Sequence, residues 1–383
     1  MKLFSGRPWW MWAFPLVTIA FLVAIPLFVW DATNAILNST DGDFGEVVVD
    51  PSEPGYESYV IATPAHLTLG IDGKGDLSMV ALISLGPNDI GGAVLLLNPS
   101  TVIGEGETIA SIFDEGGQGE TERYLREFLS IGFTTTNIMA PSNWASYVAS
   151  VAPLQILLND PLHEGSGINS VFPIESSCCP YQGSLSLELD EISGFLNWEA
   201  TSSSGDLRRL RQEDFWRSWI GKLATEVDVS AVPGEVNAGI GRMVWGLSRG
   251  EMVVVNVPQD STPEATYIDE DNLRNAVLDM VPFPMPSGPE ARVTMRLLDG
   301  VGGLDLAGEF SSELVKAGAQ IVIIGNASEY GRDTELIYHN SEDSEVVKVF
   351  KESLGTGTIY YEPLTDAAFD VTVIIGEDIR SSD

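Results

Sequence analysis

Positive charge is scarce in this chain. Its 383 residues carry 20 Lys and Arg against 55 Asp and Glu, which gives a formal net charge of −35. A protein that binds nucleic acid through its phosphates needs a basic face, so this balance argues against a nucleic-acid partner. It also argues against adhesion to an anionic bilayer surface. The composition favours an ectodomain kept in solution by self-repulsion.

Residues that bind transition metals are equally few. The chain has three histidines and two cysteines, and none of them shows the spacing of a zinc site, which argues against a transition-metal enzyme. The cysteines, Cys178 and Cys179, are adjacent. In an oxidising compartment they can form a vicinal disulfide. The alternative is two ordinary thiols in a turn.

One long uncharged run is present at the N-terminus. Residues 8–30 contain no charged side chain and have tryptophans at both ends. As a helix the run is roughly 35 Å long, enough to cross a bilayer with some tilt. Lys2 and Arg7 precede it and Asp31 follows it, so the positive-inside rule predicts a cytoplasmic tail over residues 1–7 and a single-pass anchor over 8–30. The bulk of the chain then lies outside the cytoplasm at the cell membrane. The alternative, a cleaved signal peptide, is disfavoured because no small-x-small cleavage site follows closely.

The rest of the chain divides by composition into a linker, two domains and a hinge. Residues 31–57 are acidic and turn-rich and indicate a linker. Over 58–281, short apolar runs alternate with helical patterns, which predicts an α/β domain. The proline-rich residues 282–290 indicate a hinge. The order β-α-β-β-α-β-β over 291–380 predicts a small two-layer α+β domain.

Hydrophobic periodicity and turn residues predict the elements of the larger domain. Strands are expected at Ser58–Ala62, His66–Ile71, Leu77–Leu85, Ala93–Asn98 and Met252–Val257. Helices are expected at Thr108–Asp114, Glu120–Ile131, Asn143–Val151, Ala238–Leu247 and Asp269–Leu278.

Five of the 20 cations fall within residues 206–222. Apolar residues recur there at roughly helical spacing, which predicts an amphipathic helix capped by Asp206. Arg209 and Arg211 fall in its first turns, where the helix dipole does not favour a cation. They either form salt bridges with Asp206, Glu213 and Asp214 or bind an anion such as a lipid phosphate.

The C-terminal residues resemble a known family. Arg292-Val-Thr-Met-Arg-Leu-Leu-Asp-Gly-Val-Gly-Gly and Ala317-Gly-Ala-Gln-Ile-Val-Ile-Ile-Gly-Asn-Ala are similar to the C-terminal domain that follows many LytR-CpsA-Psr domains. The closing Val371-Thr-Val-Ile-Ile-Gly-Glu-Asp extends the similarity over nearly all of 291–380. That accessory domain has no established catalytic residues, so the resemblance implies none here.

The larger domain more weakly resembles the LytR-CpsA-Psr domain itself. The similar stretches are Gly73-Lys-Gly-Asp-Leu-Ser-Met-Val-Ala-Leu-Ile-Ser-Leu and Ile109-Ala-Ser-Ile-Phe-Asp-Glu-Gly-Gly through Leu129-Ser-Ile-Gly. The resemblance implies an envelope phosphotransferase, which moves glycopolymer from a polyprenyl pyrophosphate to peptidoglycan. In that family an acidic residue, magnesium and several arginines act on the pyrophosphate.

Much of the family's catalytic pattern is absent from this chain. Asp76 matches the acid that the resemblance links to magnesium, but its neighbours differ. The Pro-Arg-Asp-Thr motif falls on Asn98-Pro99-Ser100-Thr101, and the paired-arginine motif falls on Asn197-Trp198-Glu199-Ala200. The Asp-x-x-Arg motif survives as Asp206 and Arg209. Gln212 replaces the next arginine, although Arg211 lies beside it.

Three functions are compatible with this pattern. The first is a catalytically degenerate family member, which has no cofactor and binds an envelope partner, a glycopolymer or a lipid-linked precursor. The second is a structural protein that docks other envelope proteins. The third is an active, divergent phosphotransferase that uses Asp76 with magnesium and binds phosphate through Arg209 and Arg211, next to Asp206. The alternative for Asp76 is a turn aspartate before a buried strand.

Overall fold

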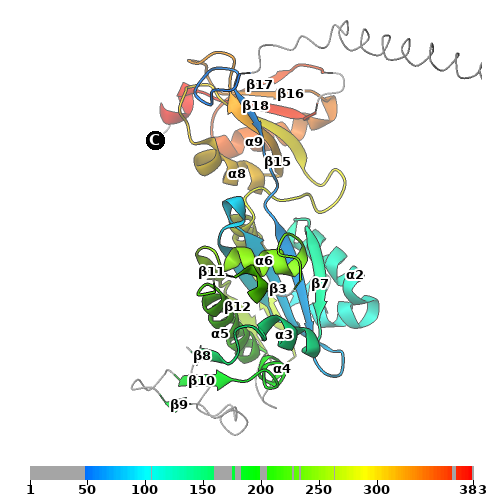
Figure 1. Cartoon of the computed structure of the whole chain (residues 1–383). Helices are drawn as coiled ribbons and strands as arrows, with labels where there is room; N and C mark the ends of the chain where they lie inside the picture. Colours follow the sequence, from blue (N-terminus) through cyan, green and yellow to red (C-terminus); the bar gives the residue numbers. More distant parts are fainter. Residues whose placement is uncertain are drawn as a thin grey trace, which may run out of the picture. The chain divides into compact units, whose positions relative to one another are not determined.

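The computed structural model describes residues 48–104, 106–158, 175–176, 183–198, 205–226, 228–232, 234–262, 264–364 and 368–381. From Pro51 onward the chain forms one compact unit with a mixed α/β fold, as the sequence predicts (Figure 1). Within these described residues no helix has the length and apolar character needed to cross a bilayer. The run at 8–30 and both cysteines lie outside them.

A five-stranded sheet forms the centre of the larger domain. Its strands lie in the order β11-β4-β3-β2-β7. Strands β2, β3 and β4 are antiparallel, while β7 is parallel to β2 and β11 is parallel to β4. The bounds are β2 Ala65–Ile71, β3 Leu77–Leu85, β4 Gly92–Leu97, β7 Thr135–Met139 and β11 Met252–Val255. All nine residues of β3 are buried, because helices cover both faces of the sheet.

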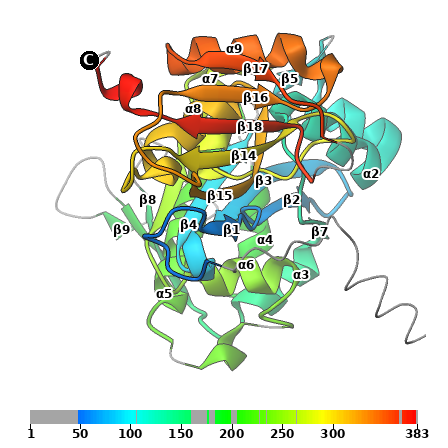
Figure 2. The ribbon, with the colours of Figure 1, turned by 90° about the horizontal axis from the view of Figure 1, so that it is seen from above.

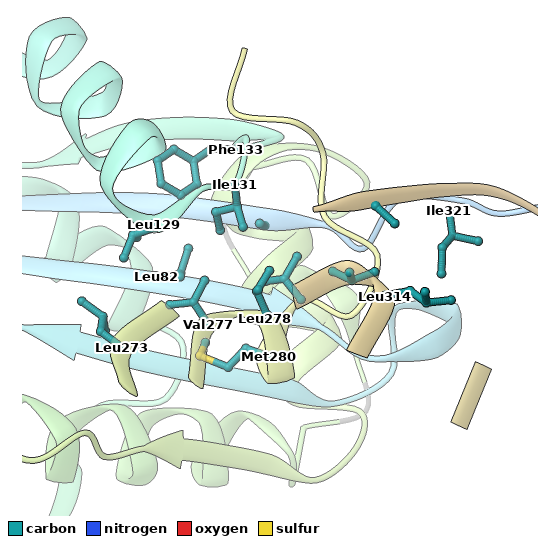
Figure 3. Packing of buried hydrophobic residues seen from close by; sticks show 14 of the residues in the cluster. Leu82, Leu129, Ile131, Phe133, Leu273, Val277, Leu278, Met280, Leu314 and Ile321 are labelled. Atoms are coloured by element: carbon teal, nitrogen blue, oxygen red, sulfur yellow. The ribbon is translucent and has the colours of Figure 1, made fainter. Parts of the chain in front are cut away.

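The two faces of this sheet carry different helices. Helices α2 (Ile109–Leu129) and α7 (Glu270–Met280) cover one face, and Leu129, Leu273 and Val277 pack there with Leu82 of β3 (Figure 3). The other face packs against α3 (Pro141–Val148), α4 (Ile192–Asn197), α5 (Asp206–Leu223) and α6 (Gly239–Leu247). The smaller elements are β5 Val102–Ile103, β6 Glu107–Thr108, β8 Leu154–Leu158, β9 Glu175–Ser176, β10 Gly183–Leu187, β12 Gln259–Ser261, β13 Thr266–Ile268, and the 3-10 turns Pro87–Asp89 and Val229–Ala231.

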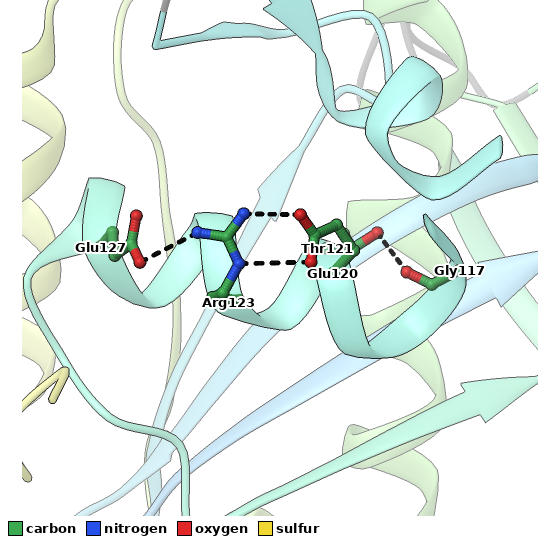
Figure 4. Close-up of polar contacts among 5 residues, drawn as sticks. All are labelled: Gly117, Glu120, Thr121, Arg123 and Glu127. Carbon is green, nitrogen blue, oxygen red and sulfur yellow. Dashed lines mark hydrogen bonds and ion pairs between the residues drawn. The ribbon is translucent and has the colours of Figure 1, made fainter. Parts of the chain in front are cut away.

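Helix α2 joins two segments that the sequence predicts as separate helices. It is interrupted at Gly117, whose φ of 66° and ψ of −159° lie outside the helical region. After this kink the helix resumes, and the Thr121 hydroxyl donates to the Gly117 carbonyl at 2.9 Å (Figure 4). Arg123 then bridges Glu120 and Glu127 along the exposed face. A glycine accommodates this break because it has no Cβ.

A six-stranded sheet forms the C-terminal domain, in the order β1-β15-β14-β18-β16-β17. The bounds are β1 Glu57–Tyr59, β14 Val293–Asp299, β15 Ala319–Asn326, β16 Glu335–Tyr338, β17 Thr358–Tyr361 and β18 Val371–Ile375. Helices α8 (Ser311–Lys316) and α9 (Ser344–Leu354) pack into the core of this domain, and 3-10 turns lie at Ser341–Asp343 and Glu377–Ser381. The predicted order β-α-β-β-α-β-β is present. The first helix begins as a π-turn at Leu306–Phe310 before α8.

Strand β1 comes from the segment that precedes the larger domain. The sequence predicts a strand of that domain at Ser58–Ala62, but the observed strand, Glu57–Tyr59, pairs antiparallel with β15 of the C-terminal sheet. Glu57 also forms an ion pair with Arg296 of β14. The main chain of Tyr56 approaches Gly325 so closely that a Cβ there would lie 2.1 Å from its carbonyl oxygen. This long-range pairing leaves no local trace in the sequence.

Candidate functional site

Helix α5 contains three of the four predicted site residues. It begins at Asp206, but Gly205 occupies the N-cap, so the predicted aspartate cap is wrong. The predicted amphipathic character is also wrong, because every residue from Arg211 to Trp216 is buried. The reason is tertiary: α5 contacts α4, α6, β4, β8 and β11, which surround it. Asp206 itself is half-buried in the first turn, where the helix dipole stabilises a carboxylate.

Arg209 is bonded inside the protein. Its side chain is 8% exposed, and it forms an ion pair with Glu213 one turn further along the helix. With its amide oxygen turned toward the guanidinium, Gln259 of β12 accepts from Nε at 2.6 Å and from Nη2 at 3.1 Å. A carboxylate and an amide oxygen therefore occupy the positions around Arg209 from which an external anion would be bound.

Arg211 is fully buried and points to main-chain carbonyls of the preceding segment. Its Nε donates to the Phe195 carbonyl at 2.9 Å, and its Nη2 donates to the Trp198 carbonyl. The guanidinium carbon also lies 5.7 Å from the centre of the Phe195 ring and 5.2 Å from that of the Trp198 ring, within cation–π range. Arg211 therefore stabilises the packing of the C-terminal end of α4 against α5.

Gln212 stands where the family resemblance places a further arginine. Its amide nitrogen donates to the carbonyls of Ser78 and Leu196, both at 3.0 Å. Ser78 is the second residue of β3, so this neutral side chain ties α5 to the sheet and to α4. A buried amide satisfies these two carbonyls without bringing a charge into the interior.

Glu213 is the acid at the centre of the α5 network. Its side chain is 3% exposed and lies between Arg209 and Arg217, whose Nη2 is 3.3 Å from the other carboxylate oxygen. Burial raises the pKa of Glu213, and the two arginines oppose that rise. Asp214, also buried, pairs with Arg217 at 3.2 Å. Local salt bridging, one of the two alternatives for these cations, is therefore present at Arg209.

Asp76 lies in the turn between β2 and β3 and is exposed. Its main-chain amide donates to the Asp72 carboxylate at 3.0 Å. Among the described residues no three His, Cys, Asp or Glu side chains are grouped closely enough to hold a metal ion. A role of Asp76 in magnesium binding stays a prediction. The start of α5 lies close to Asn98, where the family's Pro-Arg-Asp-Thr motif begins: a Cβ added to Gly205 would lie 2.3 Å from the side-chain nitrogen of Asn98.

The region beside α5 is filled by aromatic side chains. Trp216 and Trp219 of α5 are fully buried, with ring centres 5.2 Å apart. Trp144 of α3 packs edge-on against both, at 6.1 and 5.9 Å. Phe215 lies 5.6 Å from Trp144. Four hollows of about 300 to 800 Å³ are lined by described residues, and none of these four includes Asp76, Asp206, Arg209 or Arg211.

Sequence reasoning found the cations of this site and missed several of their partners. Gln259 lies 50 positions after Arg209, and the carbonyls of Phe195 and Trp198 belong to the C-terminal end of α4. No spacing rule connects such groups. Only Glu213 carried a signal, because a carboxylate four residues after an arginine shares its helix face.

The comparison with protein families matches the C-terminal domain. Residues 292–378 fit the family described as LytR cell envelope-related transcriptional attenuator. The resemblance predicted from the sequence is confirmed over this range, so these residues form a LytR C-terminal-type domain. A search of curated proteins returned no match.

Solved structures of the LytR-CpsA-Psr family are similar to the chain. "TagT bound to LIIa-WTA" is 13% identical, with a TM-score of 0.46, over 63% of this chain and 98% of that one. The LytR-CPS2A-psr family protein YwtF (TagT), with bound octaprenyl pyrophosphate lipid, is 12% identical with a TM-score of 0.43, over 62% and 92%. B. subtilis TagV is 14% identical with a TM-score of 0.42, over 57% and 97%. Similarity at this level supports no statement about activity.

Proposed function

We propose that this chain is a membrane-anchored, extracytoplasmic protein of the cell envelope that has lost phosphotransferase activity and binds a glycopolymer or its lipid-linked precursor. The observation that carries the proposal is the internal bonding of the buried arginines of α5. Arg209 is bonded to Glu213 and Gln259, and Arg211 donates to two main-chain carbonyls.

The physical argument concerns where the positive charge points. Phosphoryl transfer depends on cations aimed at the charge that develops on the transferring group. A guanidinium already paired with a buried carboxylate offers little net charge to a second anion. The arginines that the resemblance places opposite α5 fall on Pro99, Trp198 and Ala200, none of which carries a charge. Losing one such donor typically costs about 10²–10³ in rate.

The cellular setting of the proposal comes from the two ends of the chain. The LytR C-terminal-type domain at 292–378 supports a cell-envelope role. The uncharged run at 8–30, with Lys2 and Arg7 before it, supports a single-pass anchor and an extracytoplasmic bulk. An envelope protein that lacks the facing arginines of this family is better suited to binding than to phosphoryl transfer.

The direct test uses the full-length protein purified in detergent. It is incubated with magnesium, a polyprenyl-pyrophosphate-linked glycopolymer and peptidoglycan, and transfer of labelled polymer is measured. We expect no transfer above the protein-free background, while calorimetry with the lipid-linked polymer gives a saturable binding signal. The Arg209→Gln variant is compared with Arg123→Gln, a matched change at an exposed arginine of α2.

Each outcome of this test has a clear meaning. Magnesium-dependent transfer that Arg209→Gln abolishes and Arg123→Gln preserves overturns the proposal and supports an active enzyme. Absence of both transfer and binding removes the glycopolymer as ligand and leaves the docking of other envelope proteins.

A further inference from the structure

Strand β17 is one of the two outer strands of the C-terminal sheet, and no strand of the described chain lies on its outer side. Strand β17 is the last in the sheet order, and it pairs only with β16 among the described residues. Figure 2 shows the six strands in succession, from β17 beside α9 to β1 at the opposite edge. An edge strand presents unpaired N–H and C=O groups, which are a template for another strand.

The hydrogen bonds of β17 identify which of its groups face outward. The Thr358 amide donates to the Thr334 carbonyl at 2.9 Å, and the Glu362 amide donates to the Tyr338 carbonyl at 3.1 Å. Main-chain groups alternate between the two sides of a strand in a parallel ladder. The N–H and C=O groups of Ile359 and Tyr361 therefore point away from β16, toward the open side.

Several large apolar side chains around this edge are exposed. Of the thirteen exposed large hydrophobic residues in the described part of the chain, four lie between residues 349 and 364. They are Val349 of α9, Tyr360 and Tyr361 of β17, and Leu364. The two tyrosines are 49% and 51% exposed. Charged residues and proline often protect a sheet edge; Thr358-Ile-Tyr-Tyr contains neither, and Glu362 and Pro363 follow directly after the strand.

The opposite edge of the same sheet shows how such an edge is completed. There β1, from a distant part of the sequence, adds antiparallel to β15. Its neighbours extend the contact, since the Val60 amide donates to the Val322 carbonyl at 3.0 Å and the Asn326 amide donates to the Tyr56 carbonyl at 2.7 Å. Strand β15 is thus already extended by an added strand, which becomes the outer strand on that side, whereas β17 has no such addition among the described residues.

We infer that β17 is a docking edge for an extended apolar and cationic segment of another protein, which adds to the sheet as a seventh strand. A second copy of this chain is the less suitable occupant, because two chains of net charge −35 repel each other. Glu362, immediately after the strand, adds a local negative charge. In this mode main-chain hydrogen bonds supply affinity, and the exposed tyrosines select apolar side chains. The inference is independent of what the larger domain binds.

The test uses a synthetic peptide, Lys-Val-Lys-Val-Lys-Val-Lys, with a fluorescent label and the full-length protein in detergent. Binding is measured by anisotropy. A peptide N-methylated at alternate residues has the same charge but lacks the donors that a β-ladder needs. We expect the N-methylated peptide to bind at least tenfold more weakly, in keeping with the loss of one or two hydrogen bonds.

Two substitutions at one position separate main-chain pairing from side-chain contact. Tyr361→Ala removes the ring and keeps the outward amide, so the expected loss is up to about fivefold. Tyr361→Pro removes the ring and the amide, so a further loss of about tenfold is expected. Because this amide faces away from β16, an edge strand tolerates the proline. Hydrogen exchange resolved to single amides checks the geometry: peptide should slow exchange at Ile359 and Tyr361.

The contrary results are equally definite. Equal binding of the two peptides, or equal affinity of the proline and alanine variants, means that attraction is only electrostatic and overturns the inference. Failure of the peptide to bind the unmodified protein overturns it too. A dimer in sedimentation that Tyr361→Pro dissociates assigns the edge to a second copy and also overturns the proposed occupant.

Discussion

The buried ion pair between Arg209 and Glu213 gives the sharpest prediction for the interior of the larger domain. Both side chains are less than a tenth exposed, so removing one partner leaves a charge in the interior. Breaking such a pair typically costs about 3–5 kcal/mol of unfolding free energy. We expect Arg209→Met to cost about 3 kcal/mol, the lower end of that range. Arg217 still contacts the second oxygen of Glu213 and limits the loss.

A double variant distinguishes the pair from its two members. Replacing a buried ion pair by apolar residues of similar volume is often neutral. The combined Arg209→Met and Glu213→Leu variant should therefore be within about 1 kcal/mol of the unmodified protein. Unfolding free energies come from urea titrations followed by circular dichroism. Arg123→Met, at an exposed pair, serves as the control and should change stability little.

The pH dependence of the single variant provides a second check. Burial raises the pKa of Glu213, and Arg209 is the first of the influences that oppose the rise. Without Arg209 the pKa rises further, so the folded state of Arg209→Met binds a proton more readily than the unfolded state. Its deficit should be complete above the folded pKa and shrink as the pH falls toward the ordinary value of 4.5. Additive losses in the double variant, or a deficit independent of pH, would refute the reasoning.

Three further predictions concern His66 in the five-stranded sheet, Gly325 in the six-stranded sheet, and buried Arg292. Burial lowers the pKa of His66 to about 4, so the neutral side chain contributes about 3 kcal/mol of unfolding free energy above pH 6.5, and this contribution is lost as the pH falls toward 4. In urea titrations, His66→Gln should remove this dependence of the unfolding free energy on pH. Gly325→Ala should expel β1, because the new Cβ would lie 2.1 Å from the Tyr56 carbonyl oxygen, and hydrogen exchange over residues 55–60 should accelerate. Arg292→Met should cost about 2–3 kcal/mol in thermal unfolding, because buried Arg292 donates to three carbonyls, including that of Ser130 at 3.0 Å.

Local periodicity was sufficient to predict most of the elements. The strand at Leu77–Leu85 and the helix ending at Leu247 carry their signal within a few residues, and both are present as predicted. The C-terminal order of strands and helices was also predicted, because each apolar run is bounded by glycine, proline or acidic turns. Periodicity did not predict that one kinked helix spans Gly117, since a glycine pair favours a break in the chain equally well.

Composition and motif spacing were enough to identify four features: the acidic character of the chain, the long uncharged run at 8–30, the family of the C-terminal residues and the concentration of arginines in one helix. These are properties of single residues or of close neighbours, so the sequence carries them directly. Only the tertiary structure decided what those arginines contact. Gln259 meets Arg209, and the Trp198 carbonyl meets Arg211, because the sheet and α4 fold around α5. The same holds for β1, which joins a sheet formed more than 200 residues later. Contacts of this kind depend on chain topology, and a local sequence pattern contains no information about residues so far apart.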